Sequence, residues 1–557
     1  MTAAVVDAGD DLPLTVPALV RARAAERPDA KFVVCDDAPL TYAEADRRSA
    51  ELARALLAAE AGAGTRVAIL HPNGPGFVVA WLAAARIGAV SVPLSTFSTS
   101  AELVGLLRGA DVAVLLAAGA YRSHDYPDAL RAGIPGLDLG APPPLMVEAV
   151  PSLRRVAFDL DRPGPDVDPG WTMAGLLAGA PAVGAEVLAA AEAAVTPADP
   201  MVIVHTSGST SEPKGVIHAH GPLIRHLDNL NELRRYAAGE VLYSNSPFFW
   251  VGGIAYALLG TLVAGATLVC SNAPTAAGVL DVLERERPTM ANGFVASIAH
   301  LPADPSFPGR DLSSIRRGNL YPIMPEAARP ADPGLRHGML GMTEAGSVCL
   351  ASEDDGDQPE HRRGSFGRPV TGIEAQVRRA DGGDGGDGDV GELCIRGPFL
   401  MDGYVGRERH EAFDPEGWYR TGDLVTVDDE GYFYFRGRSS DMIKTAGANV
   451  SPREVEAAIL EVSGLVAHVV GVDDAARGQV VAALVRAPAG EAGGAGDDGE
   501  AGGTGEVDVD DLRARLRERL SAYKVPRRVV VVPDDAVPMM SSGKLDLRAL
   551  KELLRDA

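Results

Sequence analysis

The 557-residue sequence is short of cysteine and of positive charge. It has four cysteines and no CxxC pair, which argues against a disulfide framework and against a structural zinc site. Lysine and arginine number 52 against 76 acidic residues, which gives a formal net charge of −24. Nucleic acids and anionic membranes require a basic surface, so the charge argues against both as partners. An anionic ligand has to be held by a local site.

Long hydrophobic runs are also missing. No run reaches the roughly 18 apolar residues that a membrane-spanning helix requires. The first residues, MTAAVVDAGDDLPL, lack the basic and apolar regions of a signal peptide. We therefore expect a cytoplasmic protein without a membrane span. The length exceeds what one hydrophobic core supports, so two or more domains are expected.

Most of the chain alternates strand-like and helix-like segments. VAIL (67–70) precedes the helical pattern GFVVAWLAAARIGA (76–89), and the helical AELVGLLRGA (101–110) precedes DVAVLLAA (111–118). This alternation predicts an α/β fold with helix-covered sheets. Short alternating strands around GELCIRGPF (391–399) predict a β-rich subdomain over about 365–438.

The pattern changes again after Arg438, where helical and strand-like segments mix. We expect a large N-terminal domain over 1–438 and a small, mobile α+β C-terminal domain over 439–557. The stretch 488–507 consists almost entirely of glycine, alanine, aspartate and glutamate. This composition predicts a disordered insertion in the small domain.

The stretch HTSGSTSEPKG (205–215) has the composition of a phosphate loop. Such a loop needs inward-facing backbone N–H groups, small residues that let the anion approach, and a cation. MVIVH (201–205) before it is typical of a buried strand. The GxxxxGK[ST] pattern of kinases and GTPases is absent. The candidate phosphate ligands are Thr206, Ser207, Gly208, Ser209, Thr210 and Lys214.

Further motifs follow this loop in order. They are Gly341-Met342-Thr343-Glu344, Gly391-Glu392-Leu393 with Gly403-Tyr404, YRTGD at 419–423, the segment from Gly437 to Glu456, and Ser542-Gly543-Lys544. Together with the phosphate loop they resemble the motifs of the adenylate-forming superfamily. That superfamily contains acyl-CoA synthetases, adenylation domains of peptide synthetases and luciferases. The match is closest to bacterial stand-alone acyl-CoA ligases.

The resemblance implies an acid–thiol ligase that works in two steps. A carboxylate attacks the α-phosphate of ATP, and a thiol then attacks the acyl-adenylate. The first step concentrates negative charge and needs cationic stabilisation. By resemblance Glu344 holds Mg²⁺, Thr343 contacts phosphate, and Lys544 bridges the α-phosphate and the carboxylate. Asp423 accepts from the ribose hydroxyls, and Arg438 assists there.

The second step is expected to involve the small domain. By resemblance it turns about a hinge at Ser440, where relatives carry aspartate or lysine. This rotation of the small domain withdraws the catalytic lysine and presents the loop from Lys444 to Gly447 to coenzyme A. A glycine at 447 fits a close approach of backbone to ligand.

Two departures from the family pattern lie at the expected adenine site. Leu340 stands where relatives carry an aromatic residue that stacks on adenine. Asn319, Leu320 and Tyr321, before Pro322, replace a glycine-rich segment, and Leu320 is expected to crowd the base. Loss of a base stack costs roughly 1–3 kcal/mol, so ATP binding is expected to be weak. Either adenine sits differently and both steps run, or the enzyme mainly takes a pre-formed acyl-adenylate from a separate adenylating partner.

The third departure is Trp250, where relatives often carry histidine beside the acyl carboxylate. With Val251, Gly253 and Gly341 it is the candidate acyl-binding set. A tryptophan among apolar neighbours favours a hydrophobic acid. It argues against an amino acid, whose ammonium group needs a buried acidic partner. Fatty, aromatic and bulky terpenoid acids all remain open.

Several functions fit these residues. The leading one is a CoA ligase for a hydrophobic carboxylic acid that uses ATP or acyl-AMP, Mg²⁺ and coenzyme A. A ligase that only transfers a pre-formed acyl-adenylate is an alternative. A stand-alone domain that loads a carrier protein is another, and a non-catalytic relative that binds nucleotide or acyl-adenylate is a third. The fold alone does not decide among them.

Overall fold

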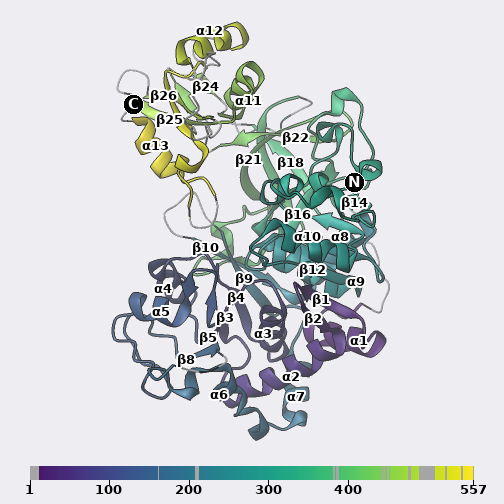
Figure 1. The fold of residues 1–557 in the computed structure, drawn as a ribbon, viewed down its shortest axis with the longest axis vertical. Coiled ribbons are helices and arrows are strands. Elements are labelled where there is room, and N and C mark those ends of the chain that lie inside the picture. The colour runs from purple at the N-terminus through teal and green to yellow at the C-terminus, as the bar shows by residue number, and fades with distance from the viewer. Residues whose placement is uncertain are drawn as a thin grey trace, which may run out of the picture. The chain divides into compact units, whose positions relative to one another are not determined.

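The computed structural model describes residues 12–555 except 161, 163, 207–212, 380–382, 384, 386–387, 440, 442, 446–447, 451, 475–477, 488–507, 521–523 and 541–543. The chain forms two compact units. The first holds the residues up to Ala375 and Ile395–Tyr419, and the second holds Gln376–Cys394 and the residues from Arg420 onward. Each unit has its own sheets (Figure 1). Each also has its own hydrophobic core.

One sheet of the first unit has seven strands. Its spatial order is β20 (Gly403–Tyr404), β10 (Lys214–Ala219), β9 (Pro200–Thr206), β4 (Val90–Pro93), β3 (Arg66–Leu70), β5 (Val114–Ala118) and β8 (Arg155–Asp159). The strands from β9 to β8 pair in parallel, whereas β10 is antiparallel to both β9 and β20. The predicted strands at 67–70, 111–118 and 201–205 correspond to β3, β5 and β9.

A second sheet of the first unit has six strands. Its order is β14 (Arg317–Gly318), β13 (Met290–Asn292), β11 (Val241–Ser244), β12 (Thr267–Cys270), β1 (Lys31–Cys35) and β2 (Ala38–Thr41). Every neighbouring pair except β1–β2 is parallel. The carboxyl ends of five strands therefore lie along one edge, where ligands of open α/β sheets bind.

Helix α3 (Pro75–Arg86) joins the two sheets because it contacts β3 and β4 of one and β1 and β2 of the other. All its residues from Phe77 to Arg86 are buried, as its nearly continuous apolar sequence requires. The other longer helices of this unit are α1 (Val16–Glu26), α2 (Tyr42–Ala58), α4 (Ser100–Gly109), α5 (Tyr126–Gly133), α7 (Ala185–Ala194), α8 (His220–Leu233) and α10 (Ala276–Glu286).

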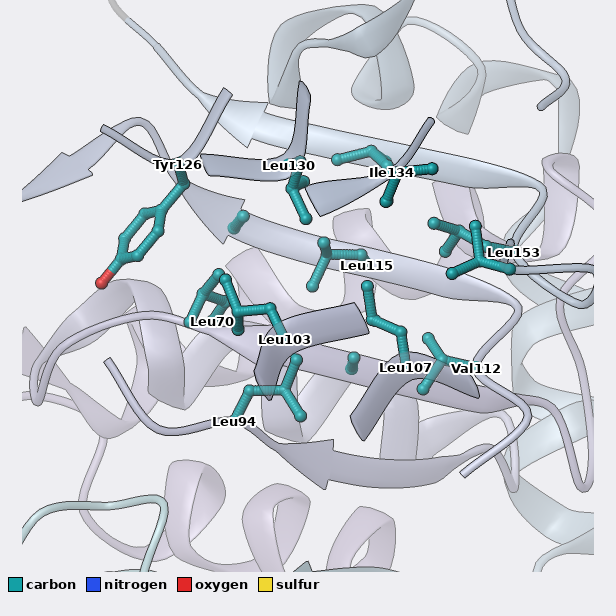
Figure 2. Close-up of a cluster of buried hydrophobic side chains, with 14 of the residues drawn as sticks. Leu70, Leu94, Leu103, Leu107, Val112, Leu115, Tyr126, Leu130, Ile134 and Leu153 are labelled. Carbon is teal, nitrogen blue, oxygen red and sulfur yellow. The ribbon is translucent and has the colours of Figure 1, made fainter. Parts of the chain in front are cut away.

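An apolar cluster beside the seven-stranded sheet shows how its helices are held. Leu103 and Leu107 of α4, Leu130 of α5 and Leu115 of β5 point into this cluster (Figure 2). Thr99 begins α4 with a reciprocal capping box to Glu102, which satisfies two backbone N–H groups at the helix start.

Three shorter elements of the first unit carry candidate site residues. Strand β15 (Leu340–Met342) pairs with β16 (Ser347–Ala351), which pairs with β17 (Arg368–Pro369). The 3₁₀ turn η10 (Thr343–Ala345) connects β15 to β16. A π-helical turn, η3 (Gly252–Leu259), continues into α9 (Gly260–Ala264).

The second unit contains mixed α+β structure. Its sheets are β18 (Glu374–Arg378), β19 (Gly391–Arg396), β21 (Tyr419–Val427) and β22 (Phe433–Arg438), and then β24 (Ala448–Val450), β23 (Ile443–Thr445), β26 (Gly478–Ala487), β25 (Ala467–Asp474) and β27 (Arg528–Pro533). Its helices are α11 (Pro452–Ser463), α12 (Val509–Arg519) and α13 (Leu547–Arg555). The chain passes between the two units within or next to the strands of the first of these sheets.

The α/β fold with helix-covered sheets, a β-rich part and an α+β C-terminal part is confirmed. The compact units divide the chain differently from a cut at 438, so the boundary at 438/439 stays a prediction about which part moves. The predicted insertion at 488–507 lies outside the described residues. No single helix in the described ranges is long and apolar enough to span a membrane; the pair Met173–Ala182 and Ala185–Ala194 reaches that length only together and is bent by 99°.

Candidate active site

The strands on either side of the predicted phosphate loop form an antiparallel hairpin. Thr206 ends β9, Lys214 begins β10, and the two are paired in register. The predicted strand that feeds the loop is therefore present, and the hairpin fixes where the loop leaves and returns. Ser207, Gly208, Ser209 and Thr210 lie outside the described residues.

Glu344 is brought to this hairpin through Tyr404. Strand β20 pairs with β10 so that Tyr404 lies opposite Val216. The Tyr404 hydroxyl donates to Glu344 Oε1 at 2.9 Å, and the Lys214 Nζ lies 5.3 Å from the centroid of the Tyr404 ring. The structure therefore groups Lys214 and Glu344, which are 130 positions apart, around one phenol.

A second tyrosine completes this group. The hydroxyls of Tyr404 and Tyr419 are 3.0 Å apart. Burial and then the Glu344 charge raise the pKa of both phenols, so both stay protonated at neutral pH. Protonated phenols are neutral donors, and they hold the Glu344 carboxylate without neutralising it.

The turn that carries Thr343 and Glu344 is anchored to the same hairpin by a histidine. His218 of β10 is buried, and its Nε2 donates to the Thr343 carbonyl at 2.7 Å. Burial lowers the pKa of His218 to about 4, so the ring is neutral at pH 7. His220 instead begins α8, and its Nδ1 accepts from the Val16 N–H at 3.2 Å. The two histidines thus serve separate structural contacts.

The chemistry of the Glu344 side chain fits the role of a magnesium ligand. Mg²⁺ is commonly held by one or two protein carboxylates together with substrate phosphates. The described residues contain no cluster of three or more His, Cys, Asp or Glu side chains placed to hold a metal. One half-buried carboxylate, held by neutral donors beside the phosphate-loop hairpin, suits a site that the substrate completes.

The candidate acyl segment is built of packed aromatic rings. Trp250 contacts Phe249 and Phe294 edge to face, with centroids 5.7 and 5.1 Å apart. Val251 follows at the entry to η3. Gly253 has to be glycine, because a Cβ there would lie 1.9 Å from the Pro247 carbonyl oxygen. Trp250 therefore belongs to a fixed aromatic group and is itself only half-buried.

The segment Asn319–Leu320–Tyr321 is placed differently from what the sequence led us to expect. The Leu320 side chain is completely buried, and it packs in a core with Ile298 and Ile323. It belongs to the core rather than to an open adenine surface, so its position does not support crowding of the base. Asn319 bonds the backbone of Gly293, and Tyr321 packs half-buried against the same core.

Leu340 and Gly341 lie in β15, directly before Thr343 and Glu344. Leu340 is half-buried and its carbonyl accepts from the Cys349 thiol at 3.4 Å. Gly341 backs onto the neighbouring strand, where a Cβ would lie 2.5 Å from the Ser347 carbonyl oxygen. Leu340 precedes the candidate magnesium ligand Glu344 by four positions in the chain, and its role beside adenine stays a prediction.

The second unit carries its own carboxylate. Asp423 of β21 is opposite Arg438 of β22, and the Arg438 Nε lies 2.8 Å from Asp423 Oδ1. The Asp423 side chain is buried, whereas Arg438 is more than half exposed. The pair presents a charge-balanced edge that fits recognition of hydroxyl groups.

Lys544 belongs to the same unit, and its carbonyl accepts from the Met540 N–H at 2.7 Å. Its side chain is exposed, yet desolvation by its surroundings and then the Arg438 charge lower its pKa. Lys444 lies in β23, opposite Asn449 of β24. Ser440, Gly447 and the Ser542-Gly543 part of the motif lie outside the described residues.

Comparison with known sequences decides the family. The profile described as "AMP-binding enzyme" matches residues 20–405, and the profile of the "AMP-binding enzyme C-terminal domain" matches residues 454–544. The chain belongs to the AMP-binding enzyme family. The resemblance drawn from the motifs is thereby confirmed. The candidate residues up to Tyr404 lie in the first matched segment and Lys544 lies in the second, whereas Asp423 and Arg438 lie between the two.

Relatives of this AMP-binding enzyme align along nearly the whole chain. A feruloyl-CoA synthase of an Amycolatopsis species is 32% identical over 94% of this chain and 96% of its own. The 3-[(3aS,4S,7aS)-7a-methyl-1,5-dioxo-octahydro-1H-inden-4-yl]propanoyl:CoA ligase of Mycobacterium tuberculosis is 32% identical over 97% of this chain and 99% of its own.

A solved structure shares the fold. The anthranilate CoA ligase AuaEII in complex with anthranoyl-AMP aligns with a TM-score of 0.75 over 98% of both chains, at 21% identity. This likeness confirms the fold of the AMP-binding enzyme.

Four residues that sequence reasoning did not single out hold the candidate site of this enzyme together. Tyr404 and Tyr419 were noted only as letters of their motifs, and His218 stands in none of the motifs given above. Phe294 stands in no motif. Their roles depend on partners 15 to 125 positions away, so no local pattern could indicate them.

Proposed function

We propose that this AMP-binding enzyme is an acyl-CoA ligase that joins a hydrophobic carboxylic acid to coenzyme A through an acyl-adenylate. The observation that carries the nucleotide half is the Glu344 carboxylate, held by protonated Tyr404 beside the Lys214 hairpin. The relatives named above are CoA synthases and ligases along nearly their whole length, which supports the same class.

In the first step a carboxylate oxygen of the acid attacks the α-phosphorus of ATP, and the bond to the pyrophosphate oxygen breaks. Mg²⁺, when bound, would neutralise charge on the phosphates. The Glu344 carboxylate would bind this ion, and Lys214 supplies a positive charge next to the phosphate loop. The backbone of Thr343 is fixed by its hydrogen bond to His218. Lys544 contributes a second cation for the charge that develops on the reacting oxygens.

In the second step the sulfur of coenzyme A attacks the acyl carbon. A C–S bond forms, the C–O bond to phosphate breaks, and AMP and the thiol proton leave. We assign the segment from Lys444 to Gly447 to this step and Ser440 to the hinge. Asp423 and Arg438 hold the ribose through both steps, because their pairing leaves acceptor and donor groups for hydroxyls.

A hydrophobic acid fits the aromatic surroundings of Trp250. Phe249, Trp250 and Phe294 form a run of edge-to-face rings, and such rings bind apolar groups through area and shape. An α-ammonium group would need an acidic partner at that place.

A second candidate, a ligase restricted to pre-formed acyl-adenylates, is favoured by one observation. Leu340 offers no aromatic face to adenine, so the enzyme binds ATP for the first step more weakly than it would with an aromatic residue at this position. The second step uses the nucleotide only as a part of the acyl-adenylate, so it does not depend on the binding of ATP.

One experiment separates the two candidates. Purified enzyme is given a pool of hydrophobic acids with Mg-ATP and CoA, or the matching acyl-AMPs with CoA, and acyl-CoA is measured by mass spectrometry. Product in both assays is expected for the two-step ligase. Product from acyl-AMP alone would establish the transfer-only ligase and point to a separate adenylating enzyme. No product in either assay would overturn the proposal.

A further inference from the structure

Three asparagines connect the loops that follow parallel strands in the first unit. Asn73 follows β3, Asn245 directly follows β11, and Asn319 directly follows β14. An asparagine amide has one acceptor oxygen and an NH₂ donor, so it can bond a backbone N–H and a backbone C=O together. Each of the three does this to a loop that follows a strand other than its own.

Asn245 holds Phe294. Its Nδ2 donates to the Phe294 carbonyl at 2.9 Å, and its Oδ1 accepts from the Phe294 N–H at 2.8 Å. Gly293 makes room for this amide, because it has φ +155° and a Cβ there would lie 1.8 Å from Asn245 Oδ1. Since β11 and β13 are neighbours, Asn245 fixes the loop after β13 to the end of β11.

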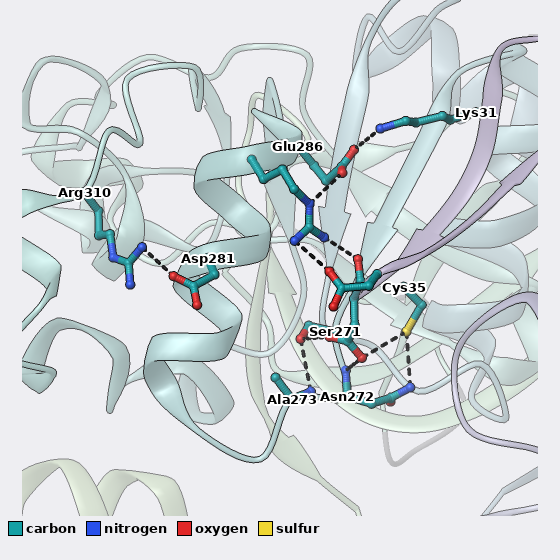
Figure 3. Close-up of polar contacts among 11 residues, drawn as sticks. Lys31, Cys35, Ser271, Asn272, Ala273, Asp281, Glu286 and Arg310 are labelled. Carbon is teal, nitrogen blue, oxygen red and sulfur yellow. Dashed lines mark hydrogen bonds and ion pairs between the residues drawn. The ribbon is translucent and has the colours of Figure 1, made fainter.

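Asn73, which follows a strand of the seven-stranded sheet, forms hydrogen bonds with the start of the aromatic segment. Its Nδ2 donates to the Ser246 carbonyl at 2.9 Å, and its Oδ1 accepts from the Phe248 N–H at 2.8 Å. Its own carbonyl accepts from Asn272 Nδ2 at 2.8 Å. Asn272 also donates to Cys35 Sγ at 3.2 Å, at the carboxyl ends of β12 and β1 (Figure 3). Asn73 is therefore itself anchored to the six-stranded sheet.

Asn319 repeats the pattern one strand further along. Its Oδ1 accepts from the Gly293 N–H at 2.9 Å, and its Nδ2 donates to the Gly293 carbonyl at 2.8 Å. Gly293 and Phe294 are thus bonded at both N–H and C=O by two different asparagines. Both backbone groups of two consecutive loop residues are bonded, and these four hydrogen bonds hold the loop in position.

What these contacts hold is a surface of three rings, which we call the aromatic wall: Phe249, Trp250 and Phe294. The rings meet at interplanar angles of 77° at both contacts. Phe249 is buried, Trp250 is half-buried, and Phe294 is 44% exposed. A large ring that is exposed while its backbone is fixed offers apolar area in a set orientation, as ligand sites do.

This wall extends the proposed ligase function to a class of substrate, and it rests on that function. We infer that Asn73 and Asn245 are positioning residues that fix the aromatic wall, and that the wall selects acids with a flat ring over acids with a flexible chain. Aromatic pairs are directional, so a ring substrate gains from rings held at set angles. An acid with a flexible aliphatic chain can adapt when the rings move, so its binding depends less on their orientation.

The test compares cinnamate with octanoate, two hydrophobic acids of similar length. For the wild type we expect a higher kcat/KM for cinnamate. In Asn245→Ala the ratio of the two kcat/KM values should fall about tenfold, through the KM for cinnamate. The KM for ATP and the kcat should stay within about twofold. Asn245→Asp keeps the acceptor for the Phe294 N–H and loses the donor, so an intermediate ratio is expected.

Two matched variants control for folding and for non-specific effects. Asn229→Ala removes a half-buried asparagine of α8 that takes no part in these contacts, and it should leave the ratio unchanged. Phe294→Leu removes one exposed ring and leaves the hydrogen bonds of the residue 294 backbone in place. It should lower the ratio as Asn245→Ala does, and it provides the test if Asn245→Ala folds poorly. Equal losses for both acids, or a loss that appears in the KM for ATP, would overturn the inference.

A binding measurement separates this inference from the ligase proposal. Cinnamoyl- and octanoyl-sulfamoyl adenosine imitate the acyl-adenylate and need no turnover. Their binding is followed by Trp250 fluorescence, taken as the difference between the wild type and Trp250→Phe. Tighter binding of the cinnamoyl compound that Asn245→Ala abolishes would support the wall even if no acyl-CoA is made. Equal binding of the two compounds by the wild type would refute it.

Discussion

The two candidate carboxylates, one in each unit, are held in opposite ways. Glu344 is bonded by the neutral phenol of Tyr404, and within the described residues no lysine or arginine forms an ion pair with it. Asp423 is buried and lies 2.8 Å from the Arg438 guanidinium. The first carboxylate therefore keeps its charge available, and the second has its charge balanced.

This difference indicates different partners. An uncompensated carboxylate attracts a cation, and Mg²⁺ with substrate phosphates satisfies it. A balanced carboxylate gains little from a further cation, but it still accepts hydrogen bonds from hydroxyls. With Lys544 near Arg438, the second unit presents two positive charges to one negative charge, which suits a phosphate-bearing substrate.

The largest effect is expected from removing a cation of the second unit. Lys544→Ala should lower acyl-adenylate formation by about a thousandfold, because the loss of one preorganised donor to developing charge costs a factor of 10²–10³ or more. Thioester formation from supplied acyl-AMP should be spared. ATP–pyrophosphate exchange and acyl-AMP-dependent CoA consumption measure the two steps. Equal losses in both would show that the lysine does not act in the first step alone.

The same lysine predicts a pH dependence. The pKa of Lys544 is lowered, first by desolvation and then by Arg438. The first step needs the charged amine, so its rate should fall as pH rises through this lowered pKa, earlier than for an ordinary lysine. Arg438→Gln removes one cause and should move the alkaline limb to higher pH. A limb that stays in place would assign it to another group.

The next effect distinguishes the carboxylates directly. Glu344→Gln should lower the first step about a hundredfold and raise the Mg²⁺ concentration needed for half-maximal rate, because the amide no longer attracts the cation. Asp423→Asn should instead raise the KM for ATP by roughly tenfold, with the Mg²⁺ dependence unchanged. Titration of both variants with Mg²⁺ at saturating ATP provides the measurement. A shared shift in Mg²⁺ dependence would break the comparison between the two sites.

A smaller effect is expected at the adenine position of the first unit. Leu340→Tyr supplies an aromatic face and should tighten ATP binding roughly tenfold, since a base stack is worth roughly 1–3 kcal/mol. Isothermal titration with ATP measures it. Leu320→Gly is the informative companion, because Leu320 is fully buried in the core. It should cost about 3–5 kcal/mol of folding stability without improving ATP affinity, as judged by denaturant unfolding. Tighter ATP binding in Leu320→Gly would restore the crowding hypothesis.

Sequence alone predicted those parts of the molecule in which a local pattern carries the information. The strands at 67–70 and 201–205, the apolar helix at 76–89 and the order of the motifs all follow from neighbours in the chain. The packing of Leu320 was not predicted, because whether a leucine faces a ligand or the core depends on distant neighbours such as Ile298. The asparagine contacts were not predicted either, since Asn73 reaches Ser246 and Phe248 across more than 170 positions.

The smallest effect tests the neutral donor itself. Tyr404→Phe removes the hydrogen bond to Glu344 but leaves its charge, and Tyr419 remains beside the carboxylate to bond it. The first step should slow by about threefold to fivefold, the range for loss of one ordinary hydrogen bond. The Mg²⁺ dependence should hardly change, in contrast to Glu344→Gln. If Tyr404→Phe shifted the Mg²⁺ dependence as far as Glu344→Gln does, the phenol would be orienting the metal ligand, and the neutral holding of Glu344 would be part of the metal site.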